Sequence, residues 1–134
     1  MVAEYFLLHL ISSTYAIVGV LCVGKISLNI TNLRCAKFPQ LIYKLVQRIT
    51  EKSYSLPLTI ERLNKLKFTP VKDYETNRLK SGLLQLSSDT NLVLDETQMQ
   101  PGKLEAEGVN NLKALGMLKG TSIIMLVGDA ERVR

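Results

Sequence analysis

Leu92-Val93-Leu94-Asp95-Glu96 is the stretch that decides the fold. Three apolar residues run directly into two adjacent carboxylates, and the polar, turn-forming run of residues 87–90 comes just before them. A short apolar run bounded by turn residues is typical of a strand that is buried on both faces. The stretch therefore predicts a buried strand that delivers Asp95 and Glu96 at its carboxyl end.

The same residues match the Walker B pattern of P-loop ATPases. In that pattern the Asp helps to hold Mg²⁺ and the neighbouring Glu polarises a water molecule. Five residues match such a pattern often by chance, so two solvated acids at a strand end are the alternative interpretation. The pattern predicts a nucleotide site only where a phosphate-binding loop accompanies it.

Alternating strand and helix patterns surround this stretch. We expect strands at residues 25–30, 56–60 and 123–127, and helices from Pro39 onward, over 61–66 and over 104–119. In the helix after Pro39, an apolar face recurs at helical spacing, formed by Leu41, Ile42, Leu45, Val46 and Ile49. Such alternation predicts an α/β fold with a mainly parallel sheet.

One near-match to a phosphate-binding loop lies at residues 19–26. Gly19, Gly24 and Lys25 have the spacing of G-x-x-x-x-G-K, but Ile26 replaces the hydroxyl residue that binds Mg²⁺. The alternating pattern after Lys25 also predicts a strand where the motif needs a helix. We interpret this match as chance spacing. An active NTPase that uses Lys25 with Asp95 and Glu96 stays open as an alternative.

The expected position of a phosphate loop is residues 31–38, between the strand at 25–30 and the helix from Pro39. That segment contains no glycine, and Lys37 is followed by Phe38 instead of a hydroxyl residue. Side chains at every position crowd the space that phosphates need. The sequence thus predicts the topology of a P-loop ATPase core without a working phosphate loop.

Residues 5–24 contain no charged side chain apart from a possible charge on His9. That length can span a bilayer, so a small membrane protein anchored by this segment is a further alternative. No Lys or Arg precedes the segment, however, and the polar run at residues 12–15 divides it. We expect a buried helix over 4–15, with His9 in the core or at its boundary, followed by a buried extended segment.

Composition narrows the class of protein. The chain has 134 residues, 46% hydrophobic and 22% charged, which fits one globular domain. The net charge of +5 permits attraction to acidic partners, but Lys and Arg form no run, so we expect no direct sequence-specific binding of nucleic acid. With two cysteines and one histidine, a His/Cys zinc site is not expected. We expect no metal and no cofactor.

Several collinear stretches carry a family resemblance. The chain resembles the mini-chromosome maintenance (MCM) complex-binding protein family over roughly residues 2–115, and most closely its plant members at 55–61 and 73–77. The residues that carry the likeness are Ala3-Glu4-Tyr5, His9-Leu10-Ile11-Ser12, Gly24-Lys25-Ile26-Ser27-Leu28-Asn29, Leu58-Thr59-Ile60-Glu61, Lys72-Asp73-Tyr74-Glu75-Thr76-Asn77-Arg78-Leu79, Ser81-Gly82-Leu83-Leu84-Gln85-Leu86, Leu92-Val93-Leu94-Asp95-Glu96-Thr97 and Gly108-Val109-Asn110-Asn111.

The resemblance implies a nuclear, non-enzymatic regulator of DNA replication that binds subunits of the MCM helicase complex and meets chromatin through them. It implies roles in unloading that complex from chromatin and in sister-chromatid cohesion. Residues 1–115 would be a fragment of the family's AAA+-like region, which has lost its ATPase motifs, and 116–134 a divergent tail. Asp95 and Glu96 would then be vestigial, with no cofactor and no membrane contact.

Overall fold

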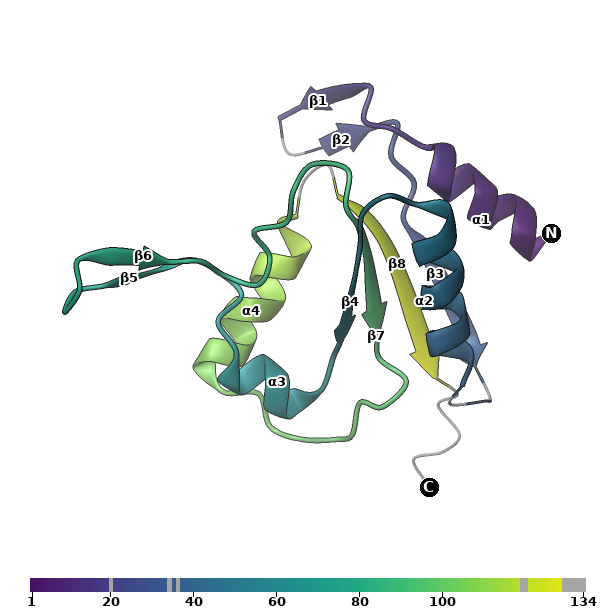
Figure 1. Cartoon of the computed structure of the whole chain (residues 1–134). Helices are drawn as coiled ribbons and strands as arrows, with labels where there is room; N and C mark the ends of the chain where they lie inside the picture. The colour runs from purple at the N-terminus through teal and green to yellow at the C-terminus, as the bar shows by residue number, and fades with distance from the viewer. Residues whose placement is uncertain (20, 34, 36, 119–120, 129–134) are drawn as a thin grey trace. The chain divides into compact units, whose positions relative to one another are not determined.

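The computed structural model describes residues 1–19, 21–33, 35, 37–118 and 121–128, and Figure 1 shows their course. In chain order the elements are α1 (Val2–Ile11), β1 (Ala16–Val18), β2 (Leu21–Val23), β3 (Leu28–Leu33), α2 (Phe38–Ile49), β4 (Ser53–Pro57), α3 (Ile60–Lys65), β5 (Val71–Asp73), β6 (Arg78–Lys80), β7 (Asn91–Asp95), α4 (Ala106–Gly116) and β8 (Ser122–Gly128).

The chain divides into two compact units. The sheet unit comprises Met1–Leu58, Ser88–Gln98 and the segment from Lys119 onward, and the α3–α4 unit comprises Thr59–Ser87 and Met99–Leu118. Each unit is described by itself below. The sheet unit contains the opening stretch, and the α3–α4 unit contains the helical pair and the β5–β6 hairpin.

A four-stranded parallel sheet with the order β3-β8-β7-β4 forms the sheet unit. In register, Ser55 lies opposite Val93, and Val93 opposite Ile124. The predicted strand is therefore an interior strand, and Leu92, Val93 and Leu94 are all buried. The α/β class, the parallel sheet and the buried strand of the opening stretch are confirmed.

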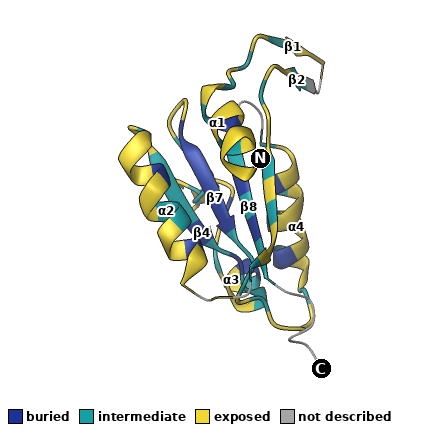
Figure 2. Ribbon diagram, turned by 90° about the vertical axis from the view of Figure 1, so that its right-hand side faces the viewer, coloured by how far each residue is buried: buried dark blue, intermediate teal, exposed yellow. Residues whose placement is uncertain are grey.

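One face of this sheet carries a compact apolar core. Val46 of α2 packs with Val93, Ile124 and Leu126, and partly buried residues surround this cluster, among them Phe6, Ile30 and Ile42. Figure 2 shows α2 lying along β4 and β7, with its buried residues turned toward the sheet. A parallel sheet needs such helical cover because every strand-to-strand crossover returns over a face.

Helix α2 begins as the sequence predicts, because Pro39 in the first turn has its φ angle preset for a helix. The prediction that its apolar face is buried is only partly confirmed. Val46 is buried and Ile42 is partly buried, but Leu41, Leu45 and Ile49 are exposed. The apolar residues of α2 cover a wider arc of the helix than the sheet can receive.

The expectation of a buried N-terminal helix and a buried extended segment is wrong. Helix α1 ends at Ile11, where Ser12 turns extended, and its only buried residue is His9. The chain then forms the β1–β2 antiparallel hairpin, in which Ile17 and Val18 are exposed. Within the part of the chain that the structure describes, no helix combines the length and the apolar character that a bilayer crossing requires.

The buried apolar residues of the α3–α4 unit are Leu63, Phe68 and Leu115 among those that the structure describes. Thr59 caps α3, since its side-chain oxygen accepts a hydrogen bond from the amide of Arg62 at 3.3 Å. The predicted helices at 61–66 and 104–119 correspond to α3 and α4. The β5–β6 hairpin, which pairs antiparallel, was not predicted as a hairpin.

Candidate functional site at the carboxyl edge of the sheet

Asp95 lies at the carboxyl end of β7, where ligands of open parallel sheets bind. Its Oδ1 atom accepts hydrogen bonds from the amide of Thr97 at 3.0 Å and from the Thr97 hydroxyl at 2.6 Å. The Glu96 amide donates to the Leu126 carbonyl oxygen at 2.9 Å. The Asp95 carboxylate thus shapes the turn that follows β7, which is a structural use of an acid at a strand end.

A hollow of about 310 Å³ lies at this edge between α2 and the strands. Among its described lining residues are Gln40, Tyr43, Lys44 and Gln47 of α2, together with Ser55 and Asp95. Transfer of a phosphoryl group requires several cations or a metal ion around the phosphates. Lys44 is the one cation among the described lining residues, and Asp95 places a negative charge in the same hollow. The hollow therefore has little electrostatic attraction for a triphosphate.

The start of α2 is also a poor cradle for phosphate. The amide of Phe38 donates to the Cys35 carbonyl oxygen at 3.0 Å, and the amide of Leu41 donates to the Lys37 carbonyl oxygen at 3.1 Å. Pro39 has no amide hydrogen. An anion at a helix start binds the free amides of the first turn. Three of the first four amide positions of α2 are therefore not available to it.

The described part of the predicted phosphate-loop segment, residues 31–38, belongs to the end of β3, the start of α2 and the short connection between them. Thr31 and Leu33 belong to β3, so the strand extends three residues beyond its predicted end. Arg34 and Ala36 lie outside the described residues. The described part of the segment is thus strand and helix start, with a short connection between them.

The near-match at residues 19–26 forms a different structure from a phosphate loop. Gly19 turns the β1–β2 hairpin with a φ of 61°, and Gly24 has a φ of 101°. A Cβ atom at Gly24 would lie 2.5 Å from the Ser13 carbonyl oxygen, so close approach of backbone explains this glycine. Strand β3 follows instead of a helix. Both glycines therefore serve turns, as the chance-spacing interpretation predicts.

Lys25 and Asp95 lie at opposite edges of the sheet. Lys25 precedes β3, and its Nζ atom is 3.9 Å from Oδ1 of Asp89, which precedes β7. Because β3 and β7 run parallel, both of these residues are at the amino edge, and a strand of five residues separates them from the carboxyl edge by about 15 Å. This fold places Lys25 at the edge of the sheet opposite Asp95 and Glu96, so it does not bring together the residues of the alternative nucleotide site.

His9 fastens α1 to the chain that leads into β3. Its Nδ1 atom is 2.5 Å from the Ile26 carbonyl oxygen, and the Ser12 hydroxyl oxygen accepts from the Ile26 amide at 3.2 Å. Burial lowers the pKa of His9 below its usual value, the hydrogen bond to Ile26 opposes this, and nearby Lys25 adds to the lowering. The prediction that His9 lies in the core or at its boundary is confirmed, since His9 is buried.

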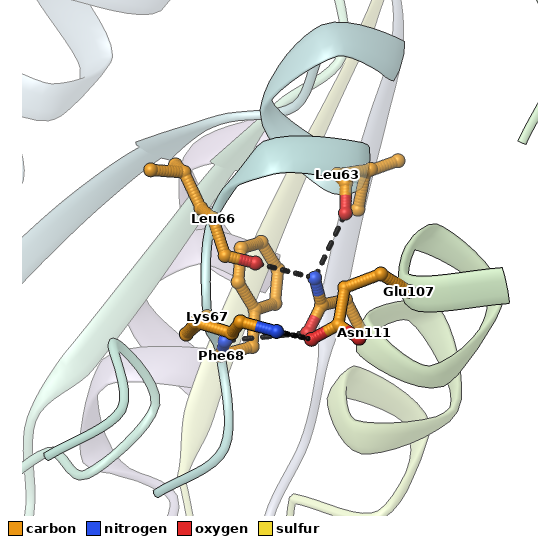
Figure 3. Close-up of polar contacts among 6 residues, drawn as sticks. All are labelled: Leu63, Leu66, Lys67, Phe68, Glu107 and Asn111. Carbon is orange, nitrogen blue, oxygen red and sulfur yellow. Dashed lines mark hydrogen bonds and ion pairs between the residues drawn. The ribbon is translucent and has the colours of Figure 1, made fainter. Parts of the chain in front are cut away.

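Asn111 is a buried polar residue that sequence reasoning missed. Figure 3 shows its side chain between α4 and α3. Its Nδ2 atom donates to the carbonyl oxygens of Leu63 at 2.8 Å and Leu66 at 2.7 Å, and its Oδ1 atom accepts from the Phe68 amide at 3.2 Å. These bonds satisfy the last carbonyls of α3, which a helix end leaves without partners. The Asn110-Asn111 pair inside an apolar periodicity was the available signal.

A second side chain joins the same two helices. Asn64 donates through Nδ2 to the Lys103 carbonyl oxygen at 3.1 Å and accepts through Oδ1 from the Glu105 amide at 3.0 Å. Glu105 is the N-cap residue that precedes α4, so Asn64 helps to fix where that helix starts. Gly108 faces this contact, because a Cβ atom there would lie only 2.3 Å from Oδ1 of Asn64 as placed.

The β5–β6 hairpin is exposed along both strands except at Asp73, which is partly buried. Lys80 pairs with Asp73 at 2.9 Å, and this hydrogen-bonded ion pair lowers the pKa of the Asp73 carboxyl group. Arg78 lies opposite Asp73 in the strand register. At the turn, Lys72 lies over the ring of Tyr74 at 5.2 Å from its centroid. These side-chain contacts add to the backbone pairing of the two-stranded ribbon.

Metal-binding chemistry is not assembled in the part of the chain that the structure describes. Across residues 1–19, 21–33, 35, 37–118 and 121–128, no three His, Cys, Asp or Glu side chains gather where they could hold an ion. Among those residues, Asp95 and Glu96 have no third carboxylate, imidazole or thiolate beside them. The site they mark is a strand edge with local hydrogen bonds.

Comparison with known proteins gives the chain its family. The model of the mini-chromosome maintenance replisome factor family matches residues 1–124, a range that ends within β8. Curated relatives named mini-chromosome maintenance complex-binding protein include those of Gallus gallus, 50% identical over 117 residues, and Homo sapiens, 47% identical over 117 residues. The relative from Drosophila melanogaster is 46% identical over 118 residues.

These alignments cover most of the chain but a small part of each relative. They include 87% of this chain, and 18% of the Gallus gallus and Homo sapiens proteins or 20% of the Drosophila melanogaster protein. The division of the chain at residue 115 stays a prediction. Since the family model matches nearly the whole sequence, the chain belongs to the mini-chromosome maintenance replisome factor family.

Proposed function

We propose that this chain is a non-enzymatic part of a protein that binds the MCM complex. The observation that carries the proposal is the family match over residues 1–124, together with relatives that are 42–50% identical and are named for binding that complex. The chain spans about a fifth of those relatives, so its own share of the binding is the point to test.

The geometry of the carboxyl edge supports a binding role over catalysis. Asp95 is engaged with Thr97, the first amides of α2 are largely occupied, and Lys25 lies at the other edge of the sheet. We interpret the sheet unit as a degenerate AAA+-like scaffold, because β3 leads into α2 and β7 ends in the acidic pair at the same edge. Such a scaffold keeps its parallel sheet for stability after its nucleotide chemistry is lost.

Three further properties follow from the family resemblance and are proposed with it. The protein acts in the nucleus, it promotes unloading of the MCM complex from chromatin, and it supports sister-chromatid cohesion. Contact with chromatin runs through the MCM subunits, because Lys and Arg form no run in the sequence of this chain.

A capture experiment tests the proposal. The tagged chain and a version extended at both ends with a relative's sequence are each incubated with purified MCM subunits, and bound subunits are identified by mass spectrometry. Capture by the chain alone supports the proposal as stated. Capture by the extended form only would show that this segment lacks a competent interface. Capture by neither would overturn the proposal.

A further inference from the structure

Helix α2 carries a row of large apolar side chains that the sheet unit leaves exposed. Phe38, Leu41, Leu45 and Ile49 are 49%, 57%, 47% and 55% exposed. Steps of three and four residues place them on one face of the helix. We call this row the apolar stripe of α2. Its ends are about 17 Å apart at 1.5 Å per residue.

The apolar stripe is separate from the face that fastens α2 to the sheet. Pro39 and Val46 are buried, and Val46 packs in the apolar cluster with Val93 and Ile124. The stripe is therefore not required to hold α2 in place. Four adjacent exposed apolar residues on one helix are a feature of binding surfaces, since solvent exposure of such a patch is unfavourable.

A basic rim runs along one side of the stripe. Lys37, Lys44 and Arg48 recur at steps of seven and four residues, so they follow the stripe on its flank, and all three are exposed. The helix from Phe38 to Ile49 contains no acidic residue. The field beside the stripe is thus positive along about three turns of helix.

We propose that the apolar stripe of α2 and its basic rim are a docking surface for an amphipathic helix of a partner protein that carries acidic side chains along one flank. This inference rests on the proposed function, in which that helix belongs to an MCM subunit. An amphipathic helix in contact with the stripe buries apolar anchors at i, i+3 or i+4 and i+7. The rim then selects acidic flanks and fixes the direction of the bound helix.

Two other kinds of partner fit the surface less well. A nucleic-acid backbone would pair with the three cations but leave the four apolar side chains in water. An anionic membrane would accept both features, yet the stripe occupies only one helix and offers a narrow apolar face for insertion. A protein helix matches the length, the width and the charge of the surface together.

The inference is tested with two synthetic helical peptides of about 18 residues, a length that permits helix formation. Both carry leucines at helical spacing, one with a glutamate flank and the other with a lysine flank. The whole chain is titrated with each peptide by fluorescence anisotropy. We expect the glutamate peptide to bind at least about tenfold more tightly than the lysine peptide, with the difference shrinking between about 0.05 M and about 0.3 M salt.

Surface variants assign the binding to the stripe. Leu41→Ser with Leu45→Ser removes two anchors, and Lys44→Glu with Arg48→Glu reverses the rim without touching the apolar side chains. We expect each pair of substitutions to weaken binding of the glutamate peptide at least about tenfold. The control is Leu79→Ser, the same change at an exposed leucine of β6 outside the stripe, which should leave binding unchanged. Circular dichroism confirms that every variant keeps its helical content.

The outcomes separate this inference from the proposed function. Equal binding of both peptides, or binding that survives loss of Leu41 and Leu45, overturns the docking surface. Two further results would also overturn it. If the wild-type chain self-associates or binds anionic vesicles, and the Leu41→Ser, Leu45→Ser variant does not, then the stripe is a self-association or membrane contact instead. If the stripe variants capture MCM subunits as well as the wild-type chain does, the proposed function stands and the docking surface is rejected. Binding of the glutamate peptide without capture of MCM subunits leaves the docking surface standing and rejects the proposed function.

Discussion

Replacing Asn111 with alanine removes three hydrogen bonds that join α4 to α3 and to the chain entering β5. The side chain is 1% exposed, so water does not replace the lost partners. Each bond contributes roughly 1 kcal/mol, and the better helix propensity of alanine returns about 0.5 kcal/mol. We expect the free energy of unfolding to fall by about 2.5 kcal/mol.

Urea denaturation followed by far-ultraviolet circular dichroism measures this effect, since the chain contains no tryptophan. With a slope of about 1.5 kcal/mol per molar urea, the midpoint should fall by about 1.7 M while the slope is unchanged. Asn110→Ala is the matched control, because it makes the same chemical change at an exposed position of the same helix. It should change stability by less than about 0.5 kcal/mol. Equal midpoints for the two variants would refute the buried network as a source of stability.

Three further predictions concern other residues. Calorimetric titration with Mg-ATP should give no saturable heat, and micromolar binding that is lost in Lys25→Ala would contradict the account. The free energy of unfolding should fall by up to about 1.4 kcal/mol per pH unit as the pH drops below 6.5. The cause is that the folded-state pKa of His9 lies below its unfolded value, so the unfolded chain binds the proton first. A similar slope in His9→Gln would exclude this cause. Gly108→Ala should cost about 1–3 kcal/mol through its clash with Asn64, whereas Gly116→Ala, with nothing within 4 Å, should cost nothing measurable by thermal melting.

The strand at residues 92–94 and the helix from Pro39 could be predicted because their signals are local. Three consecutive apolar residues before two acids have few alternatives to a buried strand, and a proline at a helix start presets the backbone. The order β3-β8-β7-β4 could not be predicted in the same way. It depends on pairings between strands far apart in sequence, which leave no local pattern.

The buried faces were predicted less well than the elements themselves. Periodicity identified α2 as amphipathic, but Leu41 and Leu45 obey the same periodicity as Val46 and are exposed. Sequence spacing states which residues share a face, whereas burial depends on whether another element covers it. The same reasoning fails for α1. Its apolar residues predicted a core helix, but only His9 of this helix is buried.

The position of the acidic pair could be predicted, because Asp95 ends β7 and Glu96 follows it, as the sequence indicates. In the described part of residues 31–38, Thr31 and Leu33 belong to β3 and Phe38 begins α2. Asn111 could not be found because one polar residue in a weakly periodic helix has many possible settings. Its role depends on α3 ending beside it, a tertiary contact.

The most direct test of the account is the affinity of the whole chain for purified MCM complex, measured by biolayer interferometry with and without Mg-ATP. The account predicts a saturable curve that is the same in both conditions and in the Asp95→Asn, Glu96→Gln double variant, because the acidic pair has a structural role. No saturable binding, or binding that requires Mg-ATP and the intact acidic pair, would contradict it.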